Sequence, residues 1–206
     1  MPTIILTNFA VHNYVESETV LKGEFGKRVL HLANLRPQKD HITLLKAFKL
    51  VLKEFPDWTL HLVGKDFNDS YSTSIKSKIK ELKLDQSVFI YGSRNDTDSI
   101  LEQCNMGVLS SVSEGLPLAI LEYGLYGLPV VATKVGDCER VIKNKDTGIL
   151  VPSENEHTLA EAIVLMIKNE ALRLNYSKRL QDHIKTQFSA ESVITQLLSI
   201  YKRTLS

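Results

Sequence analysis

The sequence predicts an α/β protein built on a doubly wound parallel sheet. From Arg28 onward, short apolar runs alternate with amphipathic stretches, and several of the runs are almost continuously apolar. Continuous apolar runs are typical of strands that helices cover on both faces. Strand–helix alternation is typical of a parallel sheet. A length of 206 residues suits one domain, or one domain with a short appendage.

Each expected element rests on apolar periodicity or on cap and turn residues. Apolar runs predict strands at residues 29–35, 58–63, 88–91, 106–110, 129–133 and 148–151. Helical spacing predicts helices or helical turns at residues 41–55, 72–84, 97–103, 117–126, 139–143, 156–168, 171–186 and 190–204. Asp40 and Asp96 are expected N-caps, and Pro117 suits a first helical position, where its missing N–H costs nothing.

Composition excludes several classes of protein. A formal net charge of +1 provides no basic field, so no nucleic-acid partner is expected. The N-terminus has no basic region typical of a signal peptide, and no apolar stretch approaches the roughly 18 residues that cross a bilayer. Cys104 and Cys138 have no metal-ligand spacing, which favours two buried thiols in a reducing cytosol. We therefore expect a cytoplasmic protein with no bound metal.

The loop between residues 106–110 and the helix that follows it carries the stronger signal for a ligand. In a doubly wound sheet, ligands bind at the carboxyl ends of strands, where loops lead into helix N-termini. Here a serine-rich loop ends in Glu114, Gly115 and Leu116 before Pro117 and Leu118 open the helix. Gly115 permits close backbone approach, and free amide groups at the helix start favour a phosphate.

Two glutamates flank that helix start. Glu122 lies in the second turn, about 7–8 Å along the axis from Pro117, and helical side chains lean toward the N-terminus. Glu114 and Glu122 therefore address one extended ligand, with its phosphates between them. A carboxylate accepts hydrogen bonds from neighbouring sugar hydroxyls, which suits a hexose at one end of a diphosphate and a ribose at the other. Such pairs also occur by chance, but an unpaired glutamate in an otherwise apolar helix is costly.

A second junction adds positive charge at the end of the first strand. Arg36 and Lys39 follow residues 29–35, where they would neutralise a diphosphate. The alternative is that both are solvated surface cations.

These residues resemble the C-terminal domain of group 1 glycosyltransferases, the retaining family four of the GT-B fold. The family pattern is Ser-x-x-Glu-Gly-(Phe/Leu)-Pro-Leu-x-x-x-Glu-Ala, then Gly-x-Pro-Val-Val-Ala, Gly-x-x-Glu and Thr-Gly-x-Leu-Val. Apart from its last Ala, it occurs here at residues 111–122, 127–132, 136–139 and 147–151. The Lys of the family's Gly-Arg-Leu-x-x-x-Lys motif aligns with Lys39. The resemblance runs from about residue 28 to 151 and, more loosely, to the end.

The resemblance implies a Rossmann-like GT-B half-domain with C-terminal helices. Residues 28–186 would bind a nucleotide-sugar donor, residues 187–206 would form a C-terminal helix, and residues 1–27 would be a linker or the end of an acceptor domain. It also implies retaining, metal-independent hexosyl transfer in polysaccharide biosynthesis. No cofactor is expected beyond the donor substrate, a UDP- or GDP-sugar.

Site residues carry over by position. Glu114 would contact the donor sugar near its reacting carbon, Glu122 would bind the ribose hydroxyls, and Lys39 would hold the diphosphate. Glu114 and Lys39 are thus the expected catalytic residues. The expected donor-binding residues are Asn34, Arg36, Tyr91, Gly92, Ser93, Gly115, Leu116, Pro117, Leu118 and Glu122, with residues 91–93 bordering the base.

Three positions depart from the family pattern. Asn34 replaces the phosphate-binding Arg, and whether Arg36 substitutes for it is left open. Asn105 replaces an Asp, and Tyr123 replaces an Ala, which changes packing more than chemistry.

The family's N-terminal acceptor domain is expected to lie outside this chain, with peripheral membrane association through that domain. Isolated, the chain should bind donor weakly and transfer poorly.

The main alternative is a non-catalytic nucleotide-binding or interaction module that keeps the fold, and the loss of Arg at Asn34 is its best support. A dinucleotide-dependent oxidoreductase is disfavoured because no G-x-G-x-x-G follows the first strand. A sugar-nucleotide epimerase would need no acceptor.

Overall fold

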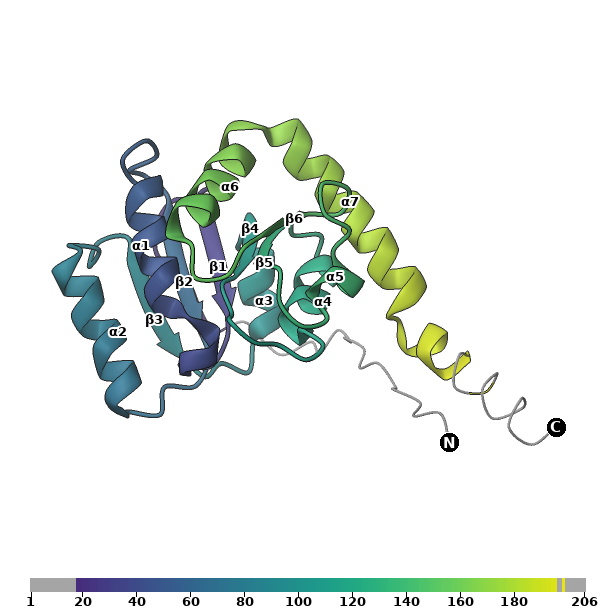
Figure 1. The fold of residues 1–206 in the computed structure, drawn as a ribbon, viewed down its shortest axis with the longest axis horizontal. Helices are drawn as coiled ribbons and strands as arrows, with labels where there is room; N and C mark the ends of the chain where they lie inside the picture. Colours follow the sequence, from purple (N-terminus) through teal and green to yellow (C-terminus); the bar gives the residue numbers. More distant parts are fainter. Residues whose placement is uncertain (1–17, 196–197, 199–206) are drawn as a thin grey trace.

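A computed structural model describes residues 18–195 and Leu198, and its centre is a parallel sheet (Figure 1). The six strands have the order β3-β2-β1-β4-β5-β6, and every pairing is parallel. The strands are β1 (Arg28–Leu32), β2 (Thr59–Val63), β3 (Val88–Gly92), β4 (Met106–Leu109), β5 (Val130–Thr133) and β6 (Ile149–Val151). The predicted doubly wound sheet is confirmed.

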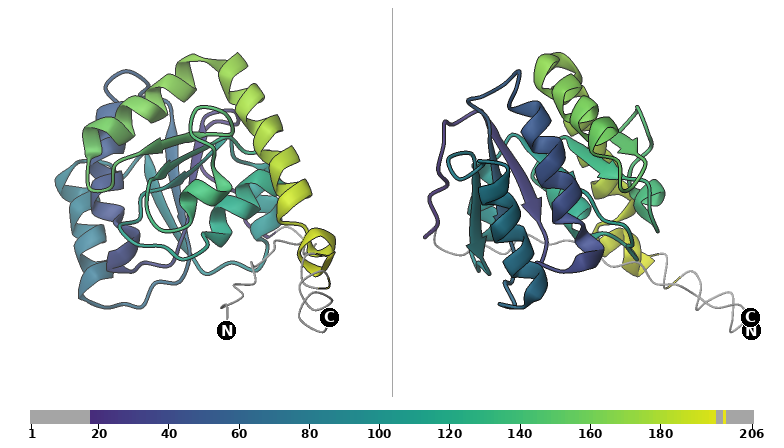
Figure 2. Two further views of the ribbon diagram at one scale, coloured as in Figure 1. Left: turned by 45° about the vertical axis from the view of Figure 1, so that its right-hand side comes forward. Right: turned by 60° about the vertical axis from the view of Figure 1, so that its left-hand side comes forward.

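Helices cover both faces of the sheet (Figures 1 and 2). They are η1 (Pro37–Lys39, a 3-10 helix), α1 (His41–Val51), α2 (Ser70–Glu81), α3 (Thr97–Glu102), α4 (Leu118–Leu125), α5 (Cys138–Val141), α6 (Glu156–Lys168) and α7 (Glu170–Gln187). Successive residues of β1 separate into two cores, since Val29 packs with α1, α2 and α6, whereas Leu30 packs with α3, α4 and α7. Alternation of this kind explains why the strand sequences are almost continuously apolar.

Several element ends differ from the sequence-based prediction. Residues 29–35 were expected to form one strand, but β1 ends at Leu32, after which Ala33 N and Leu35 N donate to Val63 O and Lys65 O. Pro117 stands at the N-cap of α4, one residue before the first helical position predicted for it. The predicted helix at 190–204 is helical at residues 190–195, and its end lies largely outside the described residues.

Asp40 caps α1 as predicted, since its side chain accepts a hydrogen bond from Thr43 N. Asp96 stands at the N-cap of α3, but its side chain does not cap that helix. Its carboxylate accepts instead from Glu18 N at 2.9 Å and Thr19 N at 2.7 Å. These partners lie far away in the sequence, so a local cap rule does not identify them.

Residues 18–27 pack against the sheet domain. Leu21 is buried, and the Arg28 guanidinium donates to Leu21 O at 3.0 Å and to Gly23 O at 2.9 Å. These bonds hold the stretch beside the start of β1. Residues 1–17, the rest of the predicted linker, lie outside the described residues.

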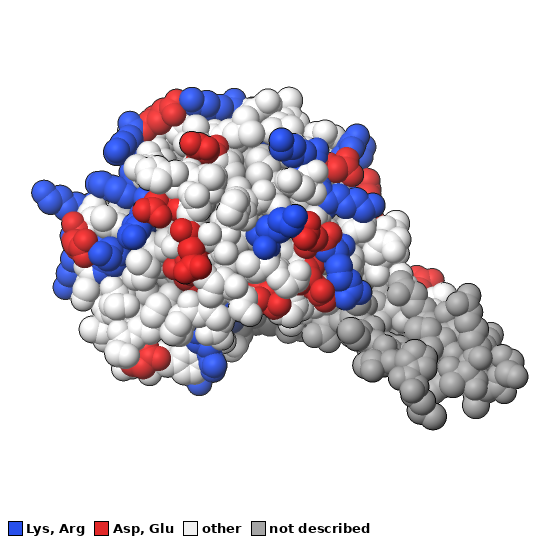
Figure 3. Space-filling model, in the orientation of Figure 1, with Lys and Arg blue, Asp and Glu red and all other residues white. Residues whose placement is uncertain are grey.

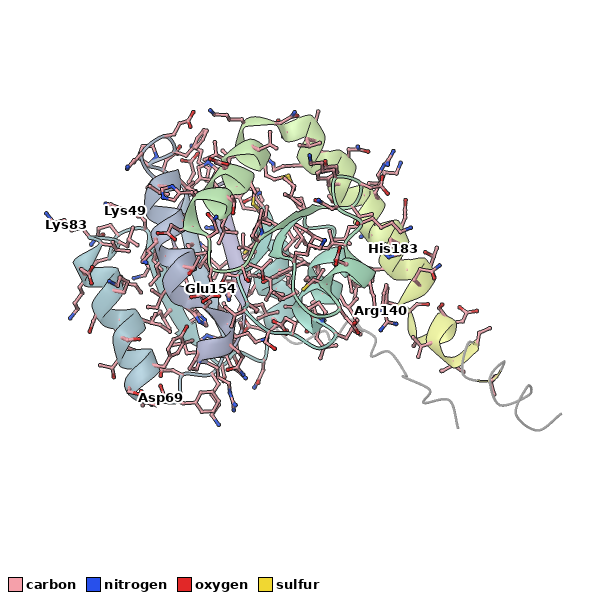
Figure 4. The ribbon with its side chains drawn as sticks, in the orientation of Figure 1. Lys49, Asp69, Lys83, Arg140, Glu154 and His183 are labelled. Atoms are coloured by element: carbon pink, nitrogen blue, oxygen red, sulfur yellow. The ribbon has the colours of Figure 1, made fainter. Side chains whose placement is uncertain are left out.

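The surface charges are mixed. On the face in Figure 3, Lys and Arg side chains are interspersed with Asp and Glu side chains. Several form ion pairs, such as Lys134 with Glu139 at 3.0 Å. At the far side of the sheet from α1, α5 and α7 approach each other, and His183 Nε2 lies 3.4 Å from Arg140 O (Figure 4). Within residues 18–195, no helix has the length and apolar character that spanning a membrane requires.

Candidate functional site

A cavity of about 360 Å³ opens at the carboxyl ends of β1, β2 and β4. The chain winds from β1 toward β3 on one side and continues from β4 toward β6 on the other, so the cavity lies at the topological switch point. Its walls are the chain just past β1, the end of β2, and the loop from β4 into α4. The predicted site residues that line it are Asn34, Lys39, Glu114, Leu116, Pro117, Leu118 and Glu122.

Lys39 and Glu114 form an ion pair in this cavity. Lys39 Nζ lies 2.6 Å from Glu114 Oε1, and the two side chains are 24% and 8% exposed. Ser111 Oγ donates to the same Oε1 at 2.6 Å. Within the described part of the chain, both hydrogen bonds to this carboxylate therefore fall on Oε1. Because the pair is partly shielded from water, its attraction is stronger than that of a fully exposed pair.

The loops after β1 and β4 are joined, which brings Lys39 to Glu114. Ser110 Oγ lies 2.8 Å from Lys39 O, and Val112 N donates to Gln38 O at 2.9 Å. Ser110 is fully buried, so the bond satisfies a hydroxyl that would otherwise be costly to bury.

The loop after β5 supports Glu114 from the other side. Thr133 Oγ1 donates to Ser111 O at 2.6 Å, and Ser111 is itself fully buried. Gly136 has φ +50°, and a Cβ there would overlap the carbonyl oxygen of Glu114. A glycine is therefore required where this loop meets the Glu114 backbone.

The N-terminus of α4 faces the cavity. Pro117 is its N-cap without a side-chain hydrogen bond, and Leu118 and Ala119 at the helix start line the cavity. The helix has 8 residues, and its first amides and positive dipole end favour an anion. A Cβ on Gly115 would have no atom within 4 Å, so this loop leaves open space beside the helix start.

Glu122 lies at the other end of the cavity wall, on α4. Its side chain is half-buried, and burial raises the pKa of Glu122, with a smaller contribution from the Asp98 carboxylate. Hydrogen-bond donors stabilise the charged form of such a carboxylate, because they replace the water that burial removes. The arrangement suits neutral hydroxyl groups of a ligand.

The structure does not bring Arg36 into the cavity. Its guanidinium stacks on the Phe67 ring, 4.5 Å from the ring centroid, outside the residues that line the cavity. Asn34 lines the cavity, and its Oδ1 accepts from Lys65 N at 2.8 Å. In this arrangement the Arg36 side chain is paired with an aromatic ring and does not line the cavity beside Asn34.

Residues 91–93 also lie outside the cavity lining. Tyr91 Oη accepts from Lys22 N at 3.0 Å and lies 3.1 Å from His61 Nδ1, so its side chain points elsewhere. Gly92 adjoins the cavity through its carbonyl, which accepts from Gly64 N at 3.0 Å. Ser93 is exposed.

The sequence-based site omits three residues that shape this region. Gly64 lines the cavity at the end of β2, and a Cβ there would overlap Ala33 O. Ser111 and Gly136 support Glu114 as described above. Ser111 and Gly136 lie within the family motifs, and Gly64 directly follows a predicted strand. Their positions in the sequence were therefore the only features that could have marked them as site residues.

The family model described as "Glycosyl transferases group 1" matches residues 16–183. The chain belongs to this family. As a group 1 glycosyl transferase, it is 27% identical over 203 residues to N-acetyl-alpha-D-glucosaminyl L-malate synthase of Bacillus anthracis. It is 29% identical over 206 aligned residues to N,N'-diacetylbacillosaminyl-diphospho-undecaprenol alpha-1,3-N-acetylgalactosaminyltransferase of Campylobacter jejuni. Each match spans 93% of this chain but only 52% and 50% of the relative, so the chain spans about half the length of these proteins.

Solved structures share the fold of this group 1 glycosyl transferase. HepE of Anabaena, in complex with UDP and glucose, superposes with a TM-score of 0.81 at 24% identity, over 87% of this chain and 49% of that one. The C-terminal domain of LpcC, a group 1 family protein of Francisella tularensis, superposes with a TM-score of 0.72 at 24% identity. That match covers 79% of this chain and 86% of the solved domain. The chain thus has the fold of a GT-B half-domain.

Proposed function

We propose that this chain is the donor-binding half of a glycosyltransferase and binds a nucleoside-diphosphate sugar in the cavity between β1 and α4. The observation that carries the proposal is the meeting of Lys39, Glu114 and Glu122 with the start of α4 around one cavity at the switch point. A cation and a helix N-terminus suit a diphosphate, and two carboxylates suit sugar hydroxyls.

In this proposal, Lys39 and the first amides of α4 hold the diphosphate and stabilise the negative charge that develops as it leaves. Glu114 lies toward the donor sugar, near the reacting carbon, and Glu122 accepts hydrogen bonds from the ribose. The complex of HepE with UDP and glucose supports a UDP-sugar donor, and a GDP-sugar is the second candidate. The base would extend past Gly64 toward Gly92, whose carbonyl bonds Gly64.

Lys39 changes partners in part when the donor binds. In the structure its ammonium is held by Glu114 Oε1. A diphosphate offers a second, more highly charged anion, while Glu114 keeps the hydrogen bond from Ser111. Glu114 therefore stays in position when Lys39 turns toward phosphate.

Transfer itself requires an acceptor, which we propose is held by an N-terminal domain outside the described residues. The same proposal includes transfer with retention of configuration and without a metal ion. It also includes action in the cytoplasm, peripheral membrane association through that domain, and a role in polysaccharide biosynthesis. Residues 28–186 would form the donor-binding domain. The non-catalytic alternative is not favoured, because membership of the family and the joint placement of Lys39 and Glu114 speak for a transferase.

Calorimetric titration with UDP, GDP, ADP and the matching nucleosides tests donor binding. We expect one nucleoside diphosphate to bind more tightly than its nucleoside, because Lys39 and α4 act on the diphosphate. Equal affinity for the diphosphate and the nucleoside, or no binding of any of the three diphosphates, would overturn the proposal.

A further inference from the structure

Tyr123 is a fully buried residue of α4, next to Glu122 in the sequence. Its ring packs directly on β4 at Gly107. A Cβ added to Gly107 would lie 2.5 Å from Tyr123 Cγ, closer than real Cβ contacts. Gly107 and Tyr123 therefore form a matched pair, in which only glycine on the strand leaves room for the ring on the helix.

The Tyr123 hydroxyl reaches between β1 and β4. It accepts a hydrogen bond from Leu32 N at 2.6 Å and lies 3.2 Å from Leu30 O and 3.3 Å from Val108 O. The register of these strands is given by two residue pairs, Val29 with Met106 and Leu30 with Gly107. Just past the second pair, a side-chain hydroxyl takes part in joining the strands.

This junction lies under the cavity. Leu32 and Leu109, the last residues of β1 and β4, both line it. The chain continues from β1 to Lys39 and from β4 to Glu114. The spacing of the two strand ends therefore sets where the two cavity walls begin.

We propose that Tyr123 is a positioning residue for the donor site, and that its hydroxyl fixes the separation of the ends of β1 and β4 on which Lys39 and Glu114 are mounted. The inference rests on the proposed function, because it concerns affinity for a nucleoside diphosphate. Tyr123 does not line the cavity and acts through the backbone of Leu32 and Val108. Without the hydroxyl, Leu32 N–H loses its phenolic partner and the strand ends readjust, since a buried unpaired N–H is costly.

Tyr123→Phe is the direct test, because it keeps the ring against Gly107 and removes only the hydroxyl. We expect UDP affinity to fall about tenfold, because Lys39 and the start of α4 are displaced from the diphosphate. The free energy of uridine binding should change by less than half as much. Hydrogen exchange at the Leu32 amide should quicken. Titrations are made well below the unfolding temperature of each variant.

Ile163→Val is the matched control for lost stability. Ile163 is fully buried on α6, in the core on the opposite face of the sheet, so this variant weakens packing away from Tyr123. It should bind UDP as the parent chain does. If Tyr123→Phe also binds UDP within twofold of the parent, the hydroxyl stabilises the fold only and the inference is overturned.

Two further outcomes are separable. A parent chain that binds no nucleoside diphosphate refutes the proposed function, and the inference with it. If Tyr123→Phe does not fold, hydrogen exchange of the parent decides, because UDP should slow exchange at the Leu32 amide, which donates to the Tyr123 hydroxyl. Unchanged exchange at this amide under saturating UDP would refute the positioning role.

Discussion

Lys39 Nζ lies 2.6 Å from Glu114 Oε1, so the cation proposed for the diphosphate and the carboxylate proposed for the sugar neutralise each other. The positive charge is thus held within the cavity by a partner that is itself anchored by Ser111. A diphosphate competes for this cation with a carboxylate that is only 8% exposed. If the donor binds as proposed, its affinity reflects the difference between the attraction of the diphosphate and that of Glu114 for the Lys39 ammonium.

The first prediction concerns Lys39. Lys39→Ala should weaken UDP binding by about 2 kcal/mol, the scale of a charge-assisted hydrogen bond, and should weaken uridine much less. Calorimetry with both ligands measures this difference. Arg36→Ala removes an equal charge from a side chain that stacks on Phe67 outside the cavity lining, so it should leave both affinities nearly unchanged. Equal losses for UDP and uridine in Lys39→Ala would reject the phosphate role.

The second prediction separates stability from binding at Glu122. Burial raises the pKa of this carboxyl, so its contribution to stability is largest when it is protonated and falls as pH rises through the ordinary Glu range toward the raised value. Glu122→Gln should therefore raise the unfolding temperature at neutral pH. It should also weaken UDP by about 1 kcal/mol, because glutamine keeps an acceptor for the ribose but loses the charge that strengthens the hydrogen bond. Unchanged UDP affinity would remove Glu122 from the site.

The third prediction compares two glycines near Glu114. Gly136→Ala should cost at least about 2 kcal/mol of unfolding free energy, because its φ is +50° and its Cβ would overlap Glu114 O. Gly115→Ala should cost less than about 1 kcal/mol, since open space surrounds that position. Urea unfolding of the two variants measures the contrast. Similar losses in both would show that Gly136 does not support the Glu114 backbone.

The fourth prediction concerns acid. Burial lowers the pKa of His41 and of His61 to about 4, so both are neutral in the folded chain at pH 5 and charged in the unfolded chain. Their folded pKa values lie below 6.5, so stability is lost as pH falls from about 6.5 toward 4. Each group should lower the free energy of unfolding by about 2 kcal/mol between pH 7 and 5.

Urea titrations at the two pH values measure that loss. His61→Gln should reduce the pH dependence relative to the parent chain. A pH dependence that is the same in the variant and the parent would contradict the assignment.

The sequence predicts the fold well because periodicity is local. Residues 156–168 were expected to be helical and form α6 with the same ends, and Asp40 caps α1 as its position suggests. Side-chain partners are set by packing between distant segments, so they are harder to anticipate. Asp96 was expected to cap α3, but its carboxylate accepts a hydrogen bond from Thr19 N. Whether Arg36 reaches a phosphate was left open, and in the structure its guanidinium stacks on Phe67.

The candidate site follows the same division. Motif spacing was enough to predict that Lys39, Glu114 and Glu122 lie near one another, because the carboxyl ends of neighbouring parallel strands lie together. All three line one cavity in the structure. The pairing of Lys39 with Glu114 was not anticipated, since it depends on how η1 and the loop after β4 are joined. Tyr123 was expected to change packing more than chemistry, and its hydroxyl also bonds the backbone of β1.

The bonds between the loops after β1 and β4 have a consequence for ligand capture. Because Ser110 Oγ contacts Lys39 O and Val112 N donates to Gln38 O, the two walls of the cavity are joined by bonds within the chain itself. The conformational entropy of these loops is then lost when the chain folds, and little further loss accompanies association. A donor should therefore bind without a slow rearrangement of these loops. Its residence time would depend on how quickly its contacts with the cavity walls break.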